Sequence, residues 1–141
     1  MSDDRFFLDT NILVYSVDLE APGKQRVASE LVRSAVGSGK GMISYQVVQE
    51  FFSVVLRFKS PMHVEDAERF LATTLRSLLR VHSSYSLFVS ALQLNRQSSL
   101  SWYDSLIVAA ALEGRCGILY SEDLQDRQKF GDLRVVNPFR Q

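Results

Sequence analysis

The sequence has little cysteine and proline, no excess of charge of either sign, and no long hydrophobic run. Its single cysteine, Cys116, has no partner for a disulfide within the chain, which is typical of proteins from reducing compartments. The longest apolar run covers residues 106–112 and is too short to cross a bilayer. The N-terminal residues do not resemble a secretory signal. We therefore expect a cytoplasmic protein with no membrane segment.

The formal net charge is zero, with 16 basic and 16 acidic residues among 141. This balance argues against a protein that binds polyanions indiscriminately, although it does not exclude a local basic patch. Twelve of the basic residues are Arg and only four are Lys, and guanidinium groups bind phosphate in a bidentate manner. The composition mildly favours a phosphate-bearing partner. The length fits a single domain over residues 1–141, large enough to bury a substantial core.

Short apolar segments alternate with segments of helical spacing. Strands are predicted at residues 5–8, 41–44, 118–121 and 133–136, with a weaker fifth at 79–82. Apolar stripes of helical spacing begin between them at Val27, Val47, Ala67, Leu87 and Trp102. The first stripe should stop at Gly37 and Gly39, and the second should run to Phe58 and stop before Ser60. The last is apolar almost all round and should be deeply buried.

This alternation predicts an α/β fold. Strands that are apolar along their whole length are typical of a parallel sheet covered by helices on both faces, here with four to five strands. Right-handed crossovers bring the carboxyl ends of such strands to one edge, where ligands bind. Asp9 stands where the first strand ends, in "RFFLDTNILVYS". We therefore expect Asp9 to lie in an active site.

Three further acids occupy comparable positions. Glu50 lies in "ISYQVVQEFFSVV", Asp104 in "SWYDSLIVAAAL" and Asp123 in "ILYSEDLQD". Asp104 also fits a capping box with Ser101, and Asp123 fits a turn. Glu50 is flanked by valine and phenylalanine, so a solvated helix face is hardly available to it. Four acids at the ends or first turns of four elements, all toward one edge, indicate a common function.

Four neighbouring carboxylates repel one another unless some bind protons or a cation. Mg²⁺ and Mn²⁺ prefer oxygen ligands of this kind. His63, His82 and Cys116 do not have ligand spacing, which makes zinc improbable. An all-carboxylate cation site suits phosphoryl transfer, because the ion activates water and neutralises the leaving oxygen. The pattern leaves open whether one or two ions bind.

The segments "FFLDTNILVY", "VVQEFF", "LSWYDSLIVAAAL" and "ILYSEDLQD" resemble, in order and spacing, the four acidic motifs of PIN-domain nucleases. The likeness is greatest to the VapC-type toxins of bacterial toxin–antitoxin pairs. It implies a three-layer α/β/α sandwich and assigns the metal-binding, catalytic acids to Asp9, Glu50, Asp104 and Asp123. Two further residues, Asn11 and Ser121, resemble the polar supports that orient the acids and bound water.

The same resemblance implies Mg²⁺- or Mn²⁺-dependent cleavage of RNA, in many such toxins of tRNA. It also implies a homodimer and a cognate antitoxin protein that inserts a segment into the cleft. Related sequences often have Gly where this chain has Arg127, so the local turn is in question. Glu122 and Asp126 lie near Asp123 and leave open which acid meets the metal; we favour Asp123.

Two aromatic residues, Trp102 and Tyr103, flank Asp104. They could stack unpaired bases, but we expect them mainly to be buried at the start of the helix. Two other functions remain open. A phosphatase of the haloacid dehalogenase type would need a second Asp two residues after Asp9, where this chain has Asn11. A PIN-like binding module without catalysis is disfavoured only because all four acids are present.

Overall fold

The computed structural model describes residues 4–58 and 61–140. Strands and helices follow in the order β1 (Phe6–Leu8), α1 (Thr10–Ser16), α2 (Pro22–Ser38), β2 (Gly41–Ser44), α3 (Tyr45–Val55), α4 (Val64–Phe70), η1 (Leu71–Leu75), α5 (Arg76–Leu78), β3 (Leu79–Val81), α6 (Tyr85–Gln97), α7 (Trp102–Glu113), β4 (Ile118–Tyr120), β5 (Lys129–Phe130) and β6 (Leu133–Val136). All five predicted strands are present. No helix in the described ranges is both long and apolar enough to cross a membrane.

The strands form one mostly parallel sheet in the order β3-β2-β1-β4-β6-β5. The pairs along β3-β2-β1-β4-β6 are parallel, and β5 is antiparallel to β6. The predicted parallel α/β fold is confirmed, but the predicted four to five strands become six. The strand β5 was not predicted, because its two residues, Lys129 and Phe130, contain no apolar run.

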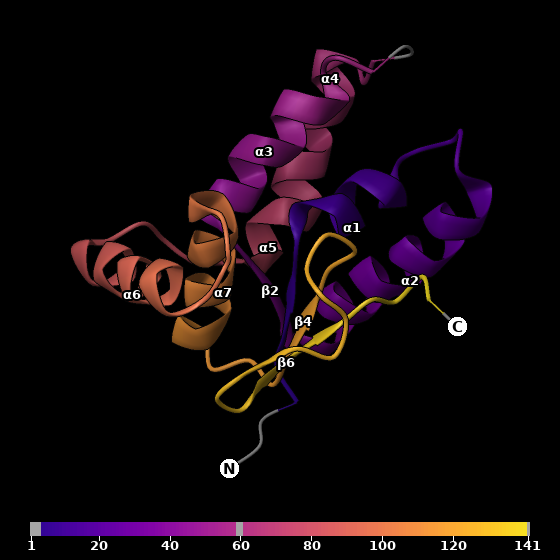
Figure 1. The fold of residues 1–141 in the computed structure, drawn as a ribbon. Coiled ribbons are helices and arrows are strands. Elements are labelled where there is room, and N and C mark those ends of the chain that lie inside the picture. The colour runs from indigo at the N-terminus through magenta and orange to yellow at the C-terminus, as the bar shows by residue number, and fades with distance from the viewer. Residues whose placement is uncertain (1–3, 59–60, 141) are drawn as a thin grey trace.

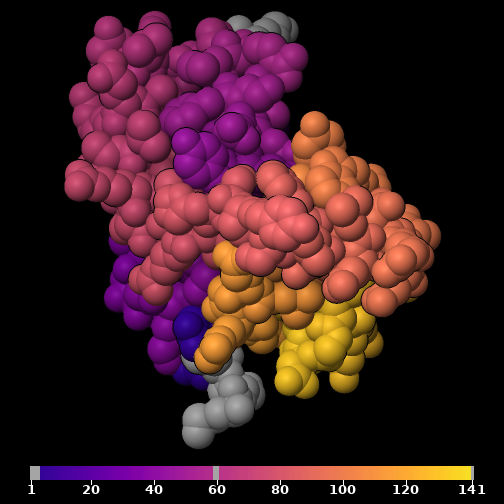
Figure 2. Space-filling view, turned by 90° about the vertical axis from the view of Figure 1, so that its left-hand side faces the viewer, coloured from indigo at the N-terminus to yellow at the C-terminus, as the bar shows by residue number. Residues whose placement is uncertain are grey.

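Helices cover both faces of the sheet, as Figure 1 shows. The helix α2 lies on one face and α7 on the other, and α6 packs against the outside of α7. Every residue of α7 from Ser105 to Ala111 is buried, which confirms that prediction. In Figure 2, α6 forms the outer surface over α7, and α3 and α4 rise beside it as a protrusion. The three-layer α/β/α arrangement is the predicted one.

The protrusion consists of α3 and of the continuous helical segment α4–η1–α5, which contains a π-helical turn at Leu71–Leu75. The two arms pack together through Phe51 and Phe70, whose stacked rings have centroids 5.2 Å apart. The prediction that the second helix runs to Phe58 was wrong, since α3 ends at Val55. Its predicted stop at Ser60 lies outside the described residues.

A short helix, α1, begins directly after β1 and was not predicted. Its apolar residues Ile12, Leu13 and Val14 are consecutive, so they carry no helical spacing to recognise. The signal for the helix is Asp9, whose Oδ1 accepts a hydrogen bond of 2.7 Å from the backbone N–H of Thr10 at the helix start. An acid at the end of a buried strand is therefore explained locally, because Asp is a favoured residue before the first helical turn.

The turn before β5 contains Arg127 in a left-handed conformation, with φ of 71°. The backbone N–H of Arg127 donates to the carbonyl of Val135 at 2.9 Å, so this hydrogen bond helps fix the turn. Residues with a Cβ pay about 1 kcal/mol or more in this region, whereas Gly does not. Arg127 therefore keeps the turn at a cost in strain.

We expect Arg127→Gly to raise the free energy of unfolding by about 1 kcal/mol, because it removes this strain. Chemical denaturation measures the change. Arg134→Gly is the matched control, since Arg134 is an exposed residue of β6, where Gly weakens a strand. Equal destabilisation by both substitutions would contradict the explanation.

Candidate active site

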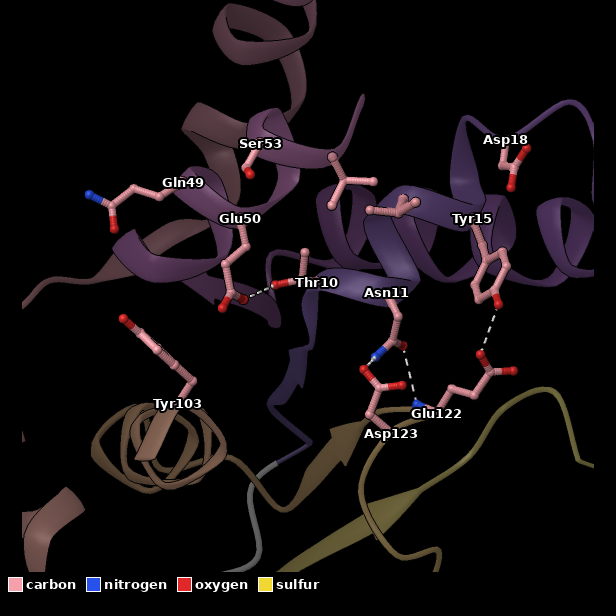
Figure 3. A pocket seen from close by; sticks show the side chains of 12 residues that line it. Thr10, Asn11, Tyr15, Asp18, Gln49, Glu50, Ser53, Tyr103, Glu122 and Asp123 are labelled. Carbon is pink, nitrogen blue, oxygen red and sulfur yellow. Dashed lines mark hydrogen bonds between the residues drawn. The ribbon is translucent and has the colours of Figure 1, made fainter. Parts of the chain in front are cut away.

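The carboxyl ends of β1 and β4 form the centre of the candidate site. The chain leaves β1 to build β2 and β3 on one side and returns to place β4 on the other, so these two strands flank the topological switch point of the sheet. Ligands in α/β sheets bind at such points. Asp9 follows β1 and Ser121 follows β4. A cleft of about 750 Å³ opens here, between α1, α3, the start of α7 and the segment after β4 (Figure 3).

Asp9 is the most buried of the acids, with 5% of its surface exposed. Its Oδ2 accepts a hydrogen bond of 2.7 Å from the Ser121 hydroxyl, and its Oδ1 is held by Thr10. Burial raises the pKa of Asp9 to about 6, against the hydrogen bonds that lower it and with help from the charges of Asp123 and Glu50. A buried carboxylate with acidic neighbours favours a bound proton or a cation.

Ser121 and Asn11 connect Asp9 to Asp123. The Ser121 hydroxyl also accepts from the backbone N–H of Asp123 at 3.2 Å. The Asn11 amide donates to Asp123 Oδ2 at 3.1 Å and to Asp9 Oδ2 at 3.4 Å, and its oxygen accepts from the backbone N–H of Glu122. Figure 3 shows the contacts of Asn11 with Asp123 and Glu122. Together with the contacts to Asp9, they set the position of both acids. They are the contacts that a supporting role for Asn11 and Ser121 requires.

Glu50 reaches the same cleft from α3. Its Oε1 accepts a hydrogen bond of 2.6 Å from the Thr10 hydroxyl, and its Oε2 accepts from the Gln46 amide at 3.1 Å. Gln46 also donates to the backbone carbonyl of Tyr103 at 3.2 Å. Gln46 therefore connects α3 to the first turn of α7 beside Asp104.

Asp104 is half-buried in the first turn of α7. Its backbone N–H donates to the Ser101 hydroxyl at 3.2 Å, so the predicted cap is present. Burial raises the pKa of the Asp104 carboxyl, and the charges of Asp123 and Glu50 raise it further, while Ser101 lowers it. Because Asp123 and Glu50 act on both Asp9 and Asp104, the four predicted acids form one electrostatic group.

Glu122 and Asp126 have other partners. The Glu122 carboxylate forms an ion pair with Lys24 and accepts a hydrogen bond of 2.9 Å from the Tyr15 hydroxyl. Burial opposes ionisation of Glu122, but Lys24 and Tyr15 outweigh it and lower its pKa. Asp126 accepts from the backbone N–H of Asn137 at 2.8 Å. Both acids are occupied elsewhere, which favours Asp123 as the acid that faces a ligand.

The cleft is acidic, as a site for a hard divalent cation would be. Among the described residues that line it, four are acids, Asp18, Glu50, Glu122 and Asp123, and none is Arg or Lys. Of the four predicted metal-binding acids, Glu50 and Asp123 line the cleft, whereas Asp9 and Asp104 are not among its lining residues. At the same edge of the sheet, the buried Ser44 hydroxyl has no hydrogen-bond partner within the described chain, and such a group favours a polar ligand nearby. Within residues 4–58 and 61–140, no three acid, His or Cys side chains lie close enough to hold one ion together. The four predicted acids are therefore not close enough in this structure to hold one ion together.

The pKa of Asp9 gives a prediction for the metal-free protein. The folded pKa of about 6 lies above the ordinary value of 3.8, so the stability linked to protonated Asp9 is present near pH 4 and is lost as the pH rises through 6. We expect Asp9→Asn to remove this loss. In chelator at pH 7.5, the variant should be no less stable than the parent. Between pH 4 and pH 7.5, the free energy of unfolding should fall by about 2 kcal/mol more in the parent than in the variant.

Unfolding by urea at both pH values measures this difference. Asp18→Asn is the control, because Asp18 lines the same cleft but its carboxylate accepts from the backbone N–H of Glu20 instead. A large loss of stability of Asp9→Asn at pH 7.5 without metal would contradict the account.

Several side chains of the site were not found in the sequence. Thr10 and Gln46 hold Glu50, and Lys24 and Tyr15 hold Glu122. Thr10 is the neighbour of Asp9 in the sequence, but its position at the start of α1, from which it contacts Glu50, could be inferred only if α1 had been predicted. The contact of Lys24 with Glu122 joins residues 98 positions apart, and no local pattern indicates it.

The expectation that both aromatics beside Asp104 are buried was half right. Trp102 is half-buried against the core, and its ring lies 6.5 Å from that of Phe88, centroid to centroid. Tyr103 is 63% exposed and lines the cleft, so the expectation was wrong for it. Successive helix positions point about 100° apart, so only one of the two rings can face the core.

The fold and the cleft together define an α/β protein with an acid-rich site at the switch point of a mostly parallel sheet. The PIN domain family model matches residues 6–130. The chain belongs to the PIN domain family, whose members are typically nucleases. The Asn11 amide, which binds Asp123, stands where a haloacid dehalogenase would need its second Asp, so that alternative is abandoned.

Two solved structures have a similar fold. A chain in the structure of FitAB bound to an IR36 DNA fragment is 15% identical, with a TM-score of 0.70 over 96% of both chains. The VapC20 toxin of Mycobacterium tuberculosis, described as cleaving the sarcin–ricin loop, is 18% identical, with a TM-score of 0.58 over 84% of this chain and 89% of that one. At these identities the likeness concerns the fold. A comparison with curated protein sequences gives no match.

Proposed function

We propose that this PIN domain is a metal-dependent endoribonuclease that hydrolyses RNA phosphodiester bonds, and that it is the toxin of a toxin–antitoxin pair. The observation that carries the proposal is the acid-rich cleft at the switch point, where Asp9 is buried, Glu50 and Asp123 line the cleft, and no basic side chain of the described chain does. VapC20, described as a toxin that cleaves the sarcin–ricin loop, has a similar fold, which supports the proposal.

Asp9, Glu50, Asp104 and Asp123 would hold Mg²⁺ or Mn²⁺. When bound, such an ion lowers the pKa of a water molecule and neutralises charge on the leaving oxygen of the phosphodiester. The chain supplies the frame for that chemistry. Ser121 and Thr10 fix the orientation of the Asp9 carboxylate.

Other hydrogen bonds position the carboxylates of Asp123 and Glu50. Asn11 steadies the exposed Asp123, and Thr10 with Gln46 directs Glu50 toward the cleft. Lys24 offsets the charge of Glu122, and the Tyr15 hydroxyl donates a hydrogen bond to it, so Glu122 adds little to the repulsion of an approaching phosphate. Asp9 and Asp123 thus sit on a hydrogen-bonded support, as ligands of a catalytic ion require.

The proposed partners follow from the relatives. The name FitAB denotes a complex of two proteins. By analogy, the proposed partner of this chain is an antitoxin protein that covers the cleft. RNA, tRNA among the candidates, is the proposed substrate. A homodimer stays a prediction.

Incubation of the purified protein with total cellular RNA tests the function. We expect new 5′ ends at a few defined positions in the presence of Mn²⁺ and none in chelator. Sequencing of the 5′ ends identifies the RNA that is cut. Intact RNA under both conditions would overturn the proposal and favour the binding module without catalysis.

A further inference from the structure

The described side chains that line the cleft carry no positive charge that could attract RNA. The cleft lining within the described chain contains acids, amides, hydroxyls and two tyrosines, but no Arg or Lys. Phosphate contacts by basic side chains normally supply most of the affinity for nucleic acid. Contacts with a base would therefore supply affinity that the side chains lining this cleft do not supply through the phosphates.

Tyr103 offers the alternative. Its side chain is 63% exposed at the start of α7, directly beside Asp104, and within the described residues no aromatic ring packs against it. Its backbone carbonyl is held by the Gln46 amide, which also holds Glu50. An exposed ring on a fixed backbone, next to the acids, is the arrangement of a stacking platform for a base.

Gln49 lies at the same end of the cleft. It is an exposed residue of α3 that lines the cleft with Tyr103, and Figure 3 shows both side chains at the end of the cleft where Glu50 lies. The carboxamide has two N–H donors and an acceptor oxygen, which match the edge of a nucleobase. A ring that stacks and an amide that reads an edge are complementary parts of one base site.

We infer that Tyr103 and Gln49 form a binding subsite for one unpaired nucleobase of the RNA, next to the phosphodiester that the acids cleave. This inference rests on the proposed function and specifies its substrate as single-stranded or looped RNA. A base within a duplex is stacked on both faces and paired along its edge, so it offers nothing to Tyr103 or Gln49 until it is unstacked.

Binding affinity tests the subsite separately from cleavage. The parent is the Asp9→Asn variant with Mg²⁺, in which labelled oligoribonucleotides should stay intact, and the readout is the Kd from fluorescence anisotropy. We expect the parent to bind a single strand more tightly than a duplex of the same sequence. Adding Tyr103→Ala should raise the Kd for the single strand about 10-fold or more, whereas Tyr103→Trp should preserve it.

Matched substitutions separate the subsite from general effects. Tyr85→Ala removes another exposed tyrosine, 84% exposed on α6, and should leave the Kd unchanged. Gln49→Ala should weaken binding about 2- to 10-fold and alter the preference among bases, and Gln93→Ala on α6 should not. An oligonucleotide with abasic sites should bind Tyr103→Ala and the parent equally, because the base and the ring act as a pair.

Equal affinities of the parent and Tyr103→Ala for the intact strand would overturn the subsite. An equal effect of Tyr103→Ala on intact and abasic strands, or no measurable binding by the parent, would also overturn it. Cleavage by the wild-type protein is scored independently on a gel. If no RNA is cleaved, the proposed function fails, while the ratio of the two affinities still decides the role of Tyr103.

Discussion

Replacing Asp9 or Asp104 by Asn should abolish RNA cleavage while the fold is retained. Loss of a supporting contact outside the metal ligands typically costs 10- to 100-fold, so we expect a loss of more than about 100-fold for a ligand itself. Asn preserves size and can still cap a helix, which matters because Asp9 precedes α1 and Asp104 lies in the first turn of α7. Initial rates with a single defined RNA measure the effect.

The controls are acids of the same cleft that have other partners. Asp18→Asn makes the same chemical change at a residue that lines the cleft, and Glu122→Gln alters an acid already paired with Lys24. We expect Asp18→Asn to keep cleavage within a few-fold of the wild type, and Glu122→Gln to lose far less than Asp123→Asn. Full activity of either Asp9→Asn or Asp104→Asn would remove the assignment of these acids.

Mg²⁺ or Mn²⁺ should raise the midpoint of thermal unfolding of the wild-type protein. A ligand that binds only the folded state at 100 times its Kd adds about 2.7 kcal/mol, which corresponds to roughly 10 °C for a chain of this size. Part of this gain would arise because the ion offsets the burial of the Asp9 carboxylate and, to a smaller extent, the charges of Asp123 and Glu50, which together raise the pKa of Asp9. Differential scanning fluorimetry at several ion concentrations measures the shift.

The shift should depend on Asp9 and on pH. We expect it to vanish in Asp9→Asn and to persist in Asp18→Asn. It should grow from pH 5 to pH 7.5, because the Asp9 carboxyl, with its pKa of about 6, must lose its proton to bind an ion. Sodium chloride at equal ionic strength controls for screening. An unchanged midpoint at millimolar divalent ion would count against a metal site.

The sequence predicted the architecture well because apolar strands and helical stripes are local patterns. The residues of β1 and of the buried core of α7 are recognisable from their composition alone, and parallel connectivity then brings Asp9 and Asp123 to one edge. The segments without such patterns were missed. The helix α1 has consecutive apolar residues, and β5 has two residues that pair only through the hairpin with β6.

The acids of the candidate site could be proposed from the sequence, but the side chains that contact them could not. The position of each acid follows from the end of a strand or the start of a helix. The contact of Thr10 with Glu50 and the pairing of Lys24 with Glu122 depend on how separate helices pack. Likewise, the exposure of Tyr103 and the burial of Trp102 depend on which side of α7 faces the core.

The measurement that bears most directly on this account is the anomalous diffraction of a crystal grown with Mn²⁺. We expect a peak among the carboxylates of Asp9, Asp104, Asp123 and Glu50, because Mn²⁺ prefers oxygen ligands of this kind. Absence of Mn²⁺ from the carboxyl edge of β1 and β4 at saturating concentration would contradict the central claim.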